Sequence, residues 1–360
     1  GVTLVSTIAT GAASAKETMN GALATRYSVD IVAMGDDISQ QMVKDVADIN
    51  GVSDTLYAPA VSVTLEKADG TQPTSALLVG VKNIDQVKQV MRANLGNASI
   101  DSDSVLMPTY NAQTGKELQF ANGTADFSTE WNQNGDATRS LTLQANQADY
   151  RRVSAQYGAV GFVDESHFTN GDLDAATHVL LVKADTDKSG VSVDDIYNDM
   201  QAALEKSTDA TVTGPIAERI VWANMIDSMM MLLVGLIAVA VLIALVGVAN
   251  TLSLSVIERT RESATLRAIG MTRGQLRRSL AVEALLISLV SGISGVLLGT
   301  LFGWLGAYVV FSMYGKVVFP FEWGINGIVL AVAAVAALLA SVFPARRAVS
   351  TPPVEALAEA

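Results

Sequence analysis

The strongest constraint on the fold comes from three long runs in the second half of the chain that carry no charged side chain. These runs are Ser228–Ile257, Ala284–Tyr314 and Gly324–Phe343. A helix needs about 20 mostly apolar residues to cross the ~30 Å hydrocarbon core of a bilayer, and the core helix of a soluble protein rarely needs so many. The sequence therefore predicts three complete transmembrane helices, at about 226–255, 279–312 and 324–344.

Charge divides the chain into two parts of different character. Residues 1–225 hold 15 Lys and Arg against 29 Asp and Glu, a net charge of −14, whereas residues 226–360 hold 9 against 7, a net charge of +2. The first part is predicted to be a water-soluble acidic domain, and the second, at 221–360, a membrane domain. Because an acidic surface repels a phosphate backbone, nucleic acid is not expected as a partner.

The acidic part is expected to be an α+β domain outside the membrane, with bounds at 25–220. Strand and helix patterns follow one another in irregular order, which favours α+β over a repeated βαβ array. The predicted helices are Asp37–Ile49, Ile84–Leu95 with a cap at Asn83, and Val193–Leu204, which Ser192 and Asp195 start with a pair that resembles a capping box. Residues 96–149 are rich in Asn, Asp, Gly, Thr and Gln and are predicted to form a β-rich second lobe. Residues 1–24 lack the basic start of a signal peptide and are interpreted as the end of a truncated transmembrane helix with a stalk.

A basic segment lies between the first two predicted spans, at Ile257–Leu280, and reads IERTRESATLRAIGMTRGQLRRSL. Lys and Arg concentrate in cytoplasmic loops, so this segment is predicted to be cytoplasmic and the acidic domain to lie on the outer side. The pair Arg346-Arg347, which follows the third predicted span, then falls on the cytoplasmic side as well. The predicted topology is therefore internally consistent.

Capping signals within the basic segment predict an elbow. Gly270 suits the end of a short helix, and Thr272 with Gln275 forms a capping box that opens the next span. A capped elbow could transmit force from a docked soluble partner to the spans. The same arginines could instead hold anionic lipid, at about 1 kcal/mol each, and the spacing alone does not separate these two interpretations.

Two segments resemble the FtsX-like permease family, which comprises the membrane subunits of MacB-, LolC- and FtsX-type ABC transporters. The first is NTLSLSVIERTRESATLRAIGMTRGQLRRSLAVEALLISLVSGISGVLLG at Asn250–Gly299, and the second is FPARRAVSTPPVEALAEA at Phe343–Ala360. The resemblance is dense over 221–360. It extends to 1–220 by layout, because the family has one span, a large extracytoplasmic domain and then three spans.

The resemblance implies a coupling helix within Glu258–Met271 that docks on an ABC-type ATPase subunit. The chain departs from the family at Ser263-Ala264-Thr265, where a more apolar run is usual, and this departure is expected to weaken helix packing slightly. The residues implied in coupling are Glu258, Arg259, Arg261, Glu262, Leu266, Arg267, Gly270 and Met271.

The resemblance also implies a non-catalytic, multi-pass subunit of the bacterial cytoplasmic membrane. It would pair with a second permease subunit or half, and the partner ATPase would bind ATP and Mg, leaving no cofactor in this chain. The expected task is export or extraction of a lipid, peptide or lipoprotein, or mechanotransmission to the outer domain, which could also bind a partner protein. Two rival hypotheses remain: a regulator of an envelope hydrolase or sensor kinase, and a membrane-anchored enzyme.

Five glycines recur at three- and four-residue spacing in the second predicted span. Small residues on one helix face allow close approach of a neighbouring helix in lipid. Such a face can pack inside one helix bundle or at a seam between two subunits, and we favour the first. The glycines are Gly292, Gly295, Gly299, Gly303 and Gly306.

Other motifs in the sequence predict no chemistry. No G-x-x-x-x-G-K-[ST] occurs, so no P-loop is expected in this chain. A segment opening at Asp185 imitates a calcium loop, but its twelfth position is Ile196 in place of the bidentate Glu. His167 and His178 are the only histidines, too few for a zinc site without carboxylates brought in by the fold. Asp164 beside His167 is a weak sign of acid–base chemistry.

Overall fold

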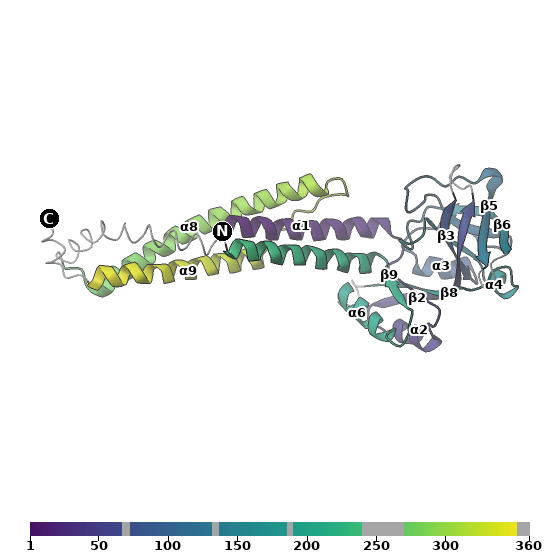
Figure 1. Cartoon of the computed structure of the whole chain (residues 1–360), viewed down its shortest axis with the longest axis horizontal. Helices are drawn as coiled ribbons and strands as arrows, with labels where there is room; N and C mark the ends of the chain where they lie inside the picture. Colours follow the sequence, from purple (N-terminus) through teal and green to yellow (C-terminus); the bar gives the residue numbers. More distant parts are fainter. Residues whose placement is uncertain (67–72, 132–136, 186–189, 240–269, 351–360) are drawn as a thin grey trace. The chain divides into compact units, whose positions relative to one another are not determined.

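The computed structural model describes residues 1–66, 73–131, 137–185, 190–239 and 270–350 (Figure 1). Two compact units divide the chain. The helical unit comprises Gly1–Met19 and Ala223–Ala360, and the sheet unit comprises Asn20–Trp222. These boundaries fall within a few residues of those predicted from charge and hydropathy, at 24/25 and 220/221.

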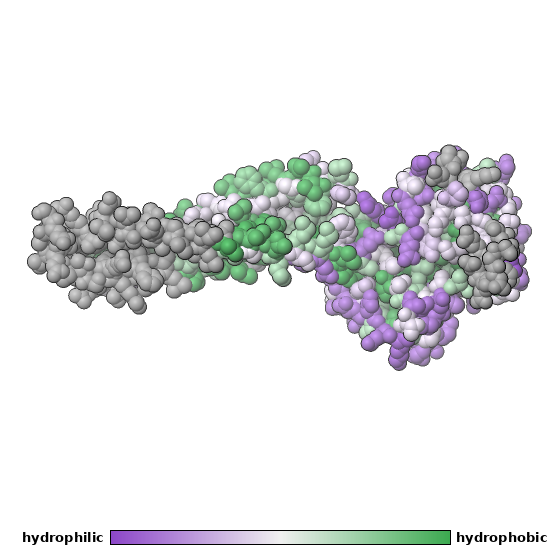
Figure 2. All heavy atoms as spheres, viewed as in Figure 1, coloured by the Kyte–Doolittle hydropathy of each residue, from purple (hydrophilic) through white to green (hydrophobic). Residues whose placement is uncertain are grey.

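Long helices build the helical unit. They are α1 (Val2–Arg26), the helix Pro215–Val239, α8 (Arg273–Phe311) and α9 (Trp323–Ser350). Within the described residues, two helices are long and apolar enough to cross a membrane, namely Pro215–Val239 and Gly274–Phe311. Figure 2 shows hydrophobic side chains on the surface of these helices and mainly hydrophilic ones on the sheet unit, as a lipid-facing unit and a water-facing unit require.

The observed helices start earlier than the predicted spans. The first predicted span, 226–255, belongs to a helix that begins at Pro215, and its end lies outside the described residues. The second, 279–312, begins at Arg273 because the capping box starts the helix before the apolar run does. The third, 324–344, lies in α9, whose described apolar part is only Trp323–Leu338. Three complete spans therefore stay a prediction.

The described part of the sheet unit contains one nine-stranded sheet, in the order β3-β7-β4-β6-β5-β2-β8-β1-β9, with a further pairing between β3 and β2. This pairing closes six of the strands into a ring, because β2 pairs with both β3 and β5. The strands are β1 (Ile31–Gly35), β2 (Val52–Glu66), β3 (Thr74–Val81), β4 (Ser104–Pro108), β5 (Thr124–Trp131), β6 (Ala137–Ala148), β7 (Ala159–Asp164), β8 (Thr177–Ala184) and β9 (Thr211–Thr213).

Strand β2 belongs to both halves of the sheet unit. Its first half pairs with β8, and its last residues pair with β5 along the same edge of the strand. The closed ring encloses an apolar core that includes Leu65, Leu78, Met107 and Phe127. A strand of 15 residues can serve both halves because a twisted strand bends along its length.

The open half of the sheet consists of β2, β8, β1 and β9 and is covered by two helices. α2 (Gln40–Ala47) and α6 (Val193–Ala203) bury one apolar side each against it, and the core there includes Ile31, Val46 and Leu180. Local signals define these helices well. The predicted cap at Ser192 is confirmed, since its hydroxyl accepts from Asp195 N at 3.1 Å.

A third helix, α3 (Ile84–Val90), packs against β2, β3 and β8. Its predicted cap at Asn83 is confirmed by a bond from Gln86 N at 3.2 Å. The predicted helix Asp37–Ile49 is shorter than expected, because Ser39 caps α2 and the helix begins only at Gln40. The shift moves Asp37 out of the helix and into contact with Ser207 and Thr208.

The predicted β-rich segment 96–149 contributes β4, β5 and β6, three of the six strands of the ring. It does not form a lobe by itself, because these strands close only by pairing with β2 and β7. The β-rich lobe therefore draws on residues both before and after the predicted bounds. The local composition indicated strands but carried no information about the partners that complete the ring.

Replacing Tyr150 by Phe should destabilise the sheet unit by about 1–2 kcal/mol, because a buried hydrogen bond is lost and its acceptors stay buried. The Tyr150 hydroxyl lies 2.5 Å from Val160 O and 3.0 Å from Leu106 O, on adjacent strands, and burial raises the pKa of this phenol so that it stays a donor. Denaturant unfolding of the full chain checks this. Tyr110→Phe, at an exposed tyrosine, is the control, and equal stabilities would contradict the prediction.

Candidate functional site

Of the elbow predicted within the basic segment, the structure describes Gly270 and the start of α8, whereas the short helix expected before Gly270 lies outside the described residues. Gly270 has φ +113°, a left-handed conformation that glycine adopts without strain. Thr272 caps the helix by accepting from Gln275 N at 3.3 Å, and the Gln275 side chain accepts from Thr272 N at 2.9 Å, which confirms the capping box. Gly270 is exposed and Met271 is half-buried. The other implied coupling residues lie outside the described residues: Glu258, Arg259, Arg261, Glu262, Leu266 and Arg267.

Three of the five predicted packing glycines, all in α8, lie against α1. A Cβ atom on Gly299 would lie 2.6 Å from both Thr3 O and Ser6 Cβ, and one on Gly303 would lie 2.8 Å from both Thr7 O and Thr10 Cβ. Both distances are shorter than real Cβ contacts. Only glycine therefore permits the observed approach of the α8 backbone to the α1 backbone.

Gly295 is the third glycine against α1, and the other two, Gly292 and Gly306, meet different surroundings. A Cβ on Gly295 would lie 3.1 Å from the Val2 side chain, and one on Gly292 would lie 2.8 Å from Leu330 Cδ2 on α9. A Cβ on Gly306 would meet no described atom within 4 Å. Four of the five predicted packing glycines thus contact helices of the same chain, and Gly306 does not.

A row of small polar side chains runs along the buried face of α1. Ser6, Thr10, Ser14 and Thr18 follow each other at four-residue spacing and are all essentially inaccessible to solvent. We call this row the polar seam. Its spacing places the four side chains on one side of the helix, the side on which Ser6 and Thr10 contact the glycines of α8.

Hydrogen bonds join the polar seam to α8, α9 and the loop between them. Ser6 Oγ donates to Asn326 Oδ1 at 2.8 Å and lies 3.3 Å from Val296 O. Thr18 Oγ1 accepts from Val318 N at 3.1 Å, and Ser14 Oγ donates to Val318 O. In a bilayer such groups need partners inside the protein, so these bonds favour a fixed packing of α1 against the other helices.

An ion pair connects α1 with the helix Pro215–Val239 inside the helical unit. Lys16 Nζ lies 2.5 Å from Asp227 Oδ1, and both side chains are partly exposed. Exposed ion pairs contribute little to stability, typically below about 1 kcal/mol. This pair therefore orients the two helices more than it stabilises them.

Within the sheet unit, the segments by which the chain enters and leaves are tied to each other. Tyr27 directly follows α1, and its hydroxyl donates to the carboxylate of Glu218 in the first turn of the helix Pro215–Val239. That turn is fixed because Gly214, at φ +103°, precedes Pro215 and accepts from Glu218 N at 3.0 Å. We call this contact between Tyr27 and Glu218 the junction.

Arg152 holds the Tyr27 side of the junction in place. Its guanidinium lies over the Tyr27 ring, 5.5 Å from the ring centre, and donates to Ala112 O at 2.5 Å. Its backbone brackets Tyr27, since Ser28 N donates to Arg152 O and Arg152 N donates to Arg26 O. Burial first and the bond to Glu218 second raise the pKa of Tyr27 well above its ordinary value, so the phenol stays a neutral donor.

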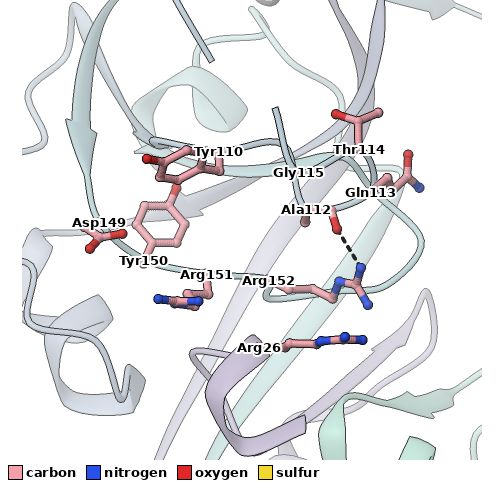
Figure 3. Close-up of a pocket in the computed structure, with 10 residues that line it drawn as sticks. All are labelled: Arg26, Tyr110, Ala112, Gln113, Thr114, Gly115, Asp149, Tyr150, Arg151 and Arg152. Atoms are coloured by element: carbon pink, nitrogen blue, oxygen red, sulfur yellow. Dashed lines mark hydrogen bonds between the residues drawn. The ribbon is translucent and has the colours of Figure 1, made fainter. Parts of the chain in front are cut away.

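An open cleft of about 750 Å³ lies beside the junction within the sheet unit (Figure 3). Three of its lining residues are arginines: Arg26 at the end of α1, and Arg151 and Arg152 after β6. The turn at 110–115 closes the opposite wall with Tyr110 and Thr114. We call this the arginine cleft. No sequence signal pointed to it, because Arg26 and the other two arginines are far apart in the chain.

The structure does not assemble the other sequence candidates into a reactive site. Both ring nitrogens of buried His167 face acceptors, Nδ1 at 3.0 Å from Asp172 Oδ2 and Nε2 at 2.7 Å from Ser102 O. Hydrogen bonds from the Ser166 hydroxyl and backbone N–H lower the pKa of Asp164. His178 stacks on Tyr57 with ring centres 5.2 Å apart. Among the described residues, no group of three His, Asp or Glu could hold a metal ion.

Comparison with known proteins identifies the membrane part. Residues 234–353 match the family model described as the C-terminal domain of FtsX-like permeases. This part of the chain resembles the FtsX-like permease family. The matched residues include the end of the helix Pro215–Val239, the start of α8 with its capping box, the glycines of α8 and all of α9.

Individual relatives show the same resemblance. A macrolide export ATP-binding/permease protein, MacB 1 of Aeromonas hydrophila, is 33% identical over 114 residues, which are 31% of this chain and 17% of that protein. An uncharacterized ABC transporter permease of Methanocaldococcus jannaschii is 27% identical over 178 residues, 48% of this chain and 44% of that protein. The chain therefore spans less than half the length of these curated relatives.

Among solved structures, the periplasmic region of MacB from Actinobacillus actinomycetemcomitans aligns with 55% of this chain and 94% of its own length. The sequence identity is 10% and the TM-score 0.32. The extracellular domain of the ABC-type transporter YknZ from Gram-positive bacteria aligns with 51% of this chain at a TM-score of 0.27 and 10% identity, over its full length. Likeness at this level says nothing about function.

Proposed function

We propose that this chain is the permease part of an ABC transporter of the cytoplasmic membrane that converts ATP hydrolysis by a partner into movement of the sheet unit. The partner ATPase would bind ATP and Mg and would dock on Glu258–Met271. The match of residues 234–353 to the FtsX-like permease family supports this proposal, as do relatives that are named ATP-binding/permease proteins. The basic charge of Ile257–Leu280 supports a docking surface inside the cell and a sheet unit outside, because Lys and Arg concentrate in cytoplasmic loops.

The junction is the observation that carries the proposal. A motion that starts at the elbow can reach the sheet unit through the chain along α1 and along the helix Pro215–Val239, because these are the two chain connections between the units. Tyr27 and Glu218 tie the ends of these two connections together. A tie of this kind delivers both helices' motion to the sheet unit as one displacement, which is what mechanotransmission requires.

The rest of the assembly follows from the same proposal. A second copy or a second permease half would complete the membrane part. In the single chain, α8 and the helix Pro215–Val239 each leave many large apolar side chains exposed, and such a surface is suited to a partner or to lipid. Lipid would cover the remainder. The moved cargo would be a lipid, peptide or lipoprotein, or the sheet unit itself would act on a partner protein outside the cell.

The proposal predicts that a single cysteine in the coupling segment cross-links to a co-expressed ABC-type ATPase. The natural chain has no cysteine, so Arg267→Cys gives a unique thiol. We expect a cross-linked band with the ATPase, lost when Gly270→Pro is added, because proline cannot adopt a positive φ. The matched control is Tyr314→Cys in the loop after α8, on the predicted outer side. Equal cross-linking from Tyr314→Cys, or none from Arg267→Cys with folded ATPase present, would reject the proposed docking.

A further inference from the structure

We propose that the arginine cleft binds a phosphate-bearing ligand, either the head group of a lipid or a soluble phosphorylated molecule. The cleft is a positive site on a negative domain. Its lining includes Arg26, Arg151 and Arg152 and one carboxylate, that of Asp149, whereas residues 1–225 as a whole carry a net charge of −14. These three arginines are half of the six arginines in that part of the chain.

The three arginines of the cleft differ from the other three arginines of the domain in their ion pairs. Each of the other three makes an ion pair: Arg92 with Asp30 at 2.7 Å, Arg139 with Asp174 at 3.9 Å and Arg219 with Asp194 at 2.7 Å. In the described part of the chain, none of the three cleft arginines has a carboxylate within ion-pair distance. The domain is rich in Asp and Glu, yet the three cleft arginines have no ion-pair partner among the described residues. Their positive charge is therefore not neutralised by the protein.

The arrangement inside the cleft leaves guanidinium groups for a ligand. Figure 3 shows the Arg26 and Arg152 side chains extending in the same direction on one side, with Asp149 on the other. Arg152 is fixed by Ala112 O and by the Tyr27 ring, while the Arg26 and Arg151 side chains are exposed. Like charges that lie side by side repel each other, and an anion bound between them removes this cost.

Several observations favour phosphate over other anions. Guanidinium groups match phosphate oxygens in bidentate geometry, and three of them exceed what one carboxylate can accept. The local net charge of the arginines and Asp149 matches a phosphomonoester. The backbone N–H groups of Gln113 and Thr114 are already bonded to Asn111 Oδ1, at 2.9 Å and 3.0 Å, so recognition depends on the side chains.

The size of the cleft indicates that the phosphate belongs to a larger molecule. About 750 Å³ is in the range of pockets that hold small organic ligands and far exceeds one phosphate ion. The exposed ring of Tyr110 offers an apolar face to the part that carries the phosphate. A glycerol or sugar unit, from a lipid head group or from a soluble compound, fits these surroundings.

Calorimetric titration of the full chain in a neutral detergent tests the inference with two probes, glycerol 3-phosphate and dihexanoyl phosphatidic acid. We expect binding that Arg26→Gln and Arg151→Gln each weaken at least tenfold. In the described part of the chain neither side chain makes a hydrogen bond or an ion pair, so both variants should fold, and Arg139→Gln is the matched control that should leave the affinity unchanged. Binding of the short lipid alone would identify a lipid head group as the ligand, and equal binding of both probes would identify the phosphate with its glycerol.

Three results would overturn the inference. The first is the absence of binding by both phosphate probes at low salt. The second is equal affinity of the wild type and the two glutamine variants, because the ligand would then sit elsewhere. The third is equally tight binding of succinate, which has two carboxylates and no phosphate, because the cleft would then accept acidic groups in general. The cross-linking of the coupling segment is independent of all three.

Discussion

Gly299→Ala and Gly303→Ala are each expected to lower the thermal stability of the purified permease, whereas Gly306→Ala is not. The added methyl group of Gly299→Ala would overlap Thr3 O and Ser6 Cβ at 2.6 Å, and that of Gly303→Ala would overlap Thr7 O and Thr10 Cβ at 2.8 Å. One contact in each pair is a backbone oxygen, which cannot rotate away. The helices must therefore separate, at a cost of about 1–3 kcal/mol for overpacking.

The separation of α1 from α8 would also disturb the polar seam. Ser6 donates to Asn326 on α9 and lies close to Val296 and Thr300 on α8, so these bonds lengthen when the helix backbones move apart. Polar groups that lose partners inside a membrane find no water to replace them. The expected effect of Gly299→Ala is therefore larger than packing alone would give.

The same helix provides graded controls. Gly292→Ala meets only Leu330 Cδ2, the far end of a flexible side chain, so a small loss is expected. Gly306→Ala meets no described atom within 4 Å and should be neutral or slightly stabilising, because alanine favours helix over glycine. Thermal unfolding in detergent, followed by tryptophan fluorescence, ranks the four variants. Equal changes in stability at Gly299 and Gly306 would contradict the prediction, because contact with α1 would then not determine the effect of these substitutions.

Local chemistry made much of this fold predictable. The caps at Asn83, Ser192 and Thr272 were identified because each depends on two residues only three positions apart. The apolar runs located the helices of the membrane part because each run is continuous in the sequence. The ends of the predicted spans were less accurate, since a cap such as Thr272 starts a helix before its apolar run begins.

Long-range pairing accounts for what the sequence did not reveal. The composition of 96–149 indicated strands, but the closure of the ring depends on β2 bonding to both β3 and β5. Tyr27 and Glu218 are 191 positions apart, and nothing in either local sequence distinguishes them from the other polar residues of the domain. The polar seam could have been predicted from the sequence, because the four-residue spacing of Ser6, Thr10, Ser14 and Thr18 matches the spacing of the glycines that it meets.

Breaking the junction is expected to uncouple the sheet unit from the ATPase without preventing ATPase docking. Tyr27→Phe keeps the buried ring and its contact with Arg152 but removes the hydroxyl that donates to Glu218. Glu218→Gln keeps the shape of the acceptor and removes its charge. A hydrogen bond to a charged group contributes about 1.5–3 kcal/mol, and the partial exposure of Glu218 places this one in the lower part of that range.

The measurement reads the movement of the sheet unit and the docking of the ATPase separately. ATP-dependent change is read from spin labels on the sheet unit at Lys116 and on the helical unit at Lys316, while docking is read from the Arg267→Cys cross-link. In Tyr27→Phe and in Glu218→Gln, we expect the ATP-dependent change between the labels to fall by at least half and the cross-link to persist. A double variant that adds nothing to either single one would show that both act through one bond.

Arg219→Gln is the matched control for this experiment. Arg219 directly follows Glu218 in the same helical turn, and its exposed ion pair with Asp194 also connects this helix to the sheet unit. Exposed pairs of this kind are worth little, so Arg219→Gln should retain most of the ATP-dependent change. If Arg219→Gln uncouples the sheet unit as strongly as Tyr27→Phe does, any contact at this turn suffices and the buried phenol has no special role. If only the junction variants uncouple it, the force passes through the bond between the Tyr27 hydroxyl and Glu218, where the chain enters and leaves the sheet unit.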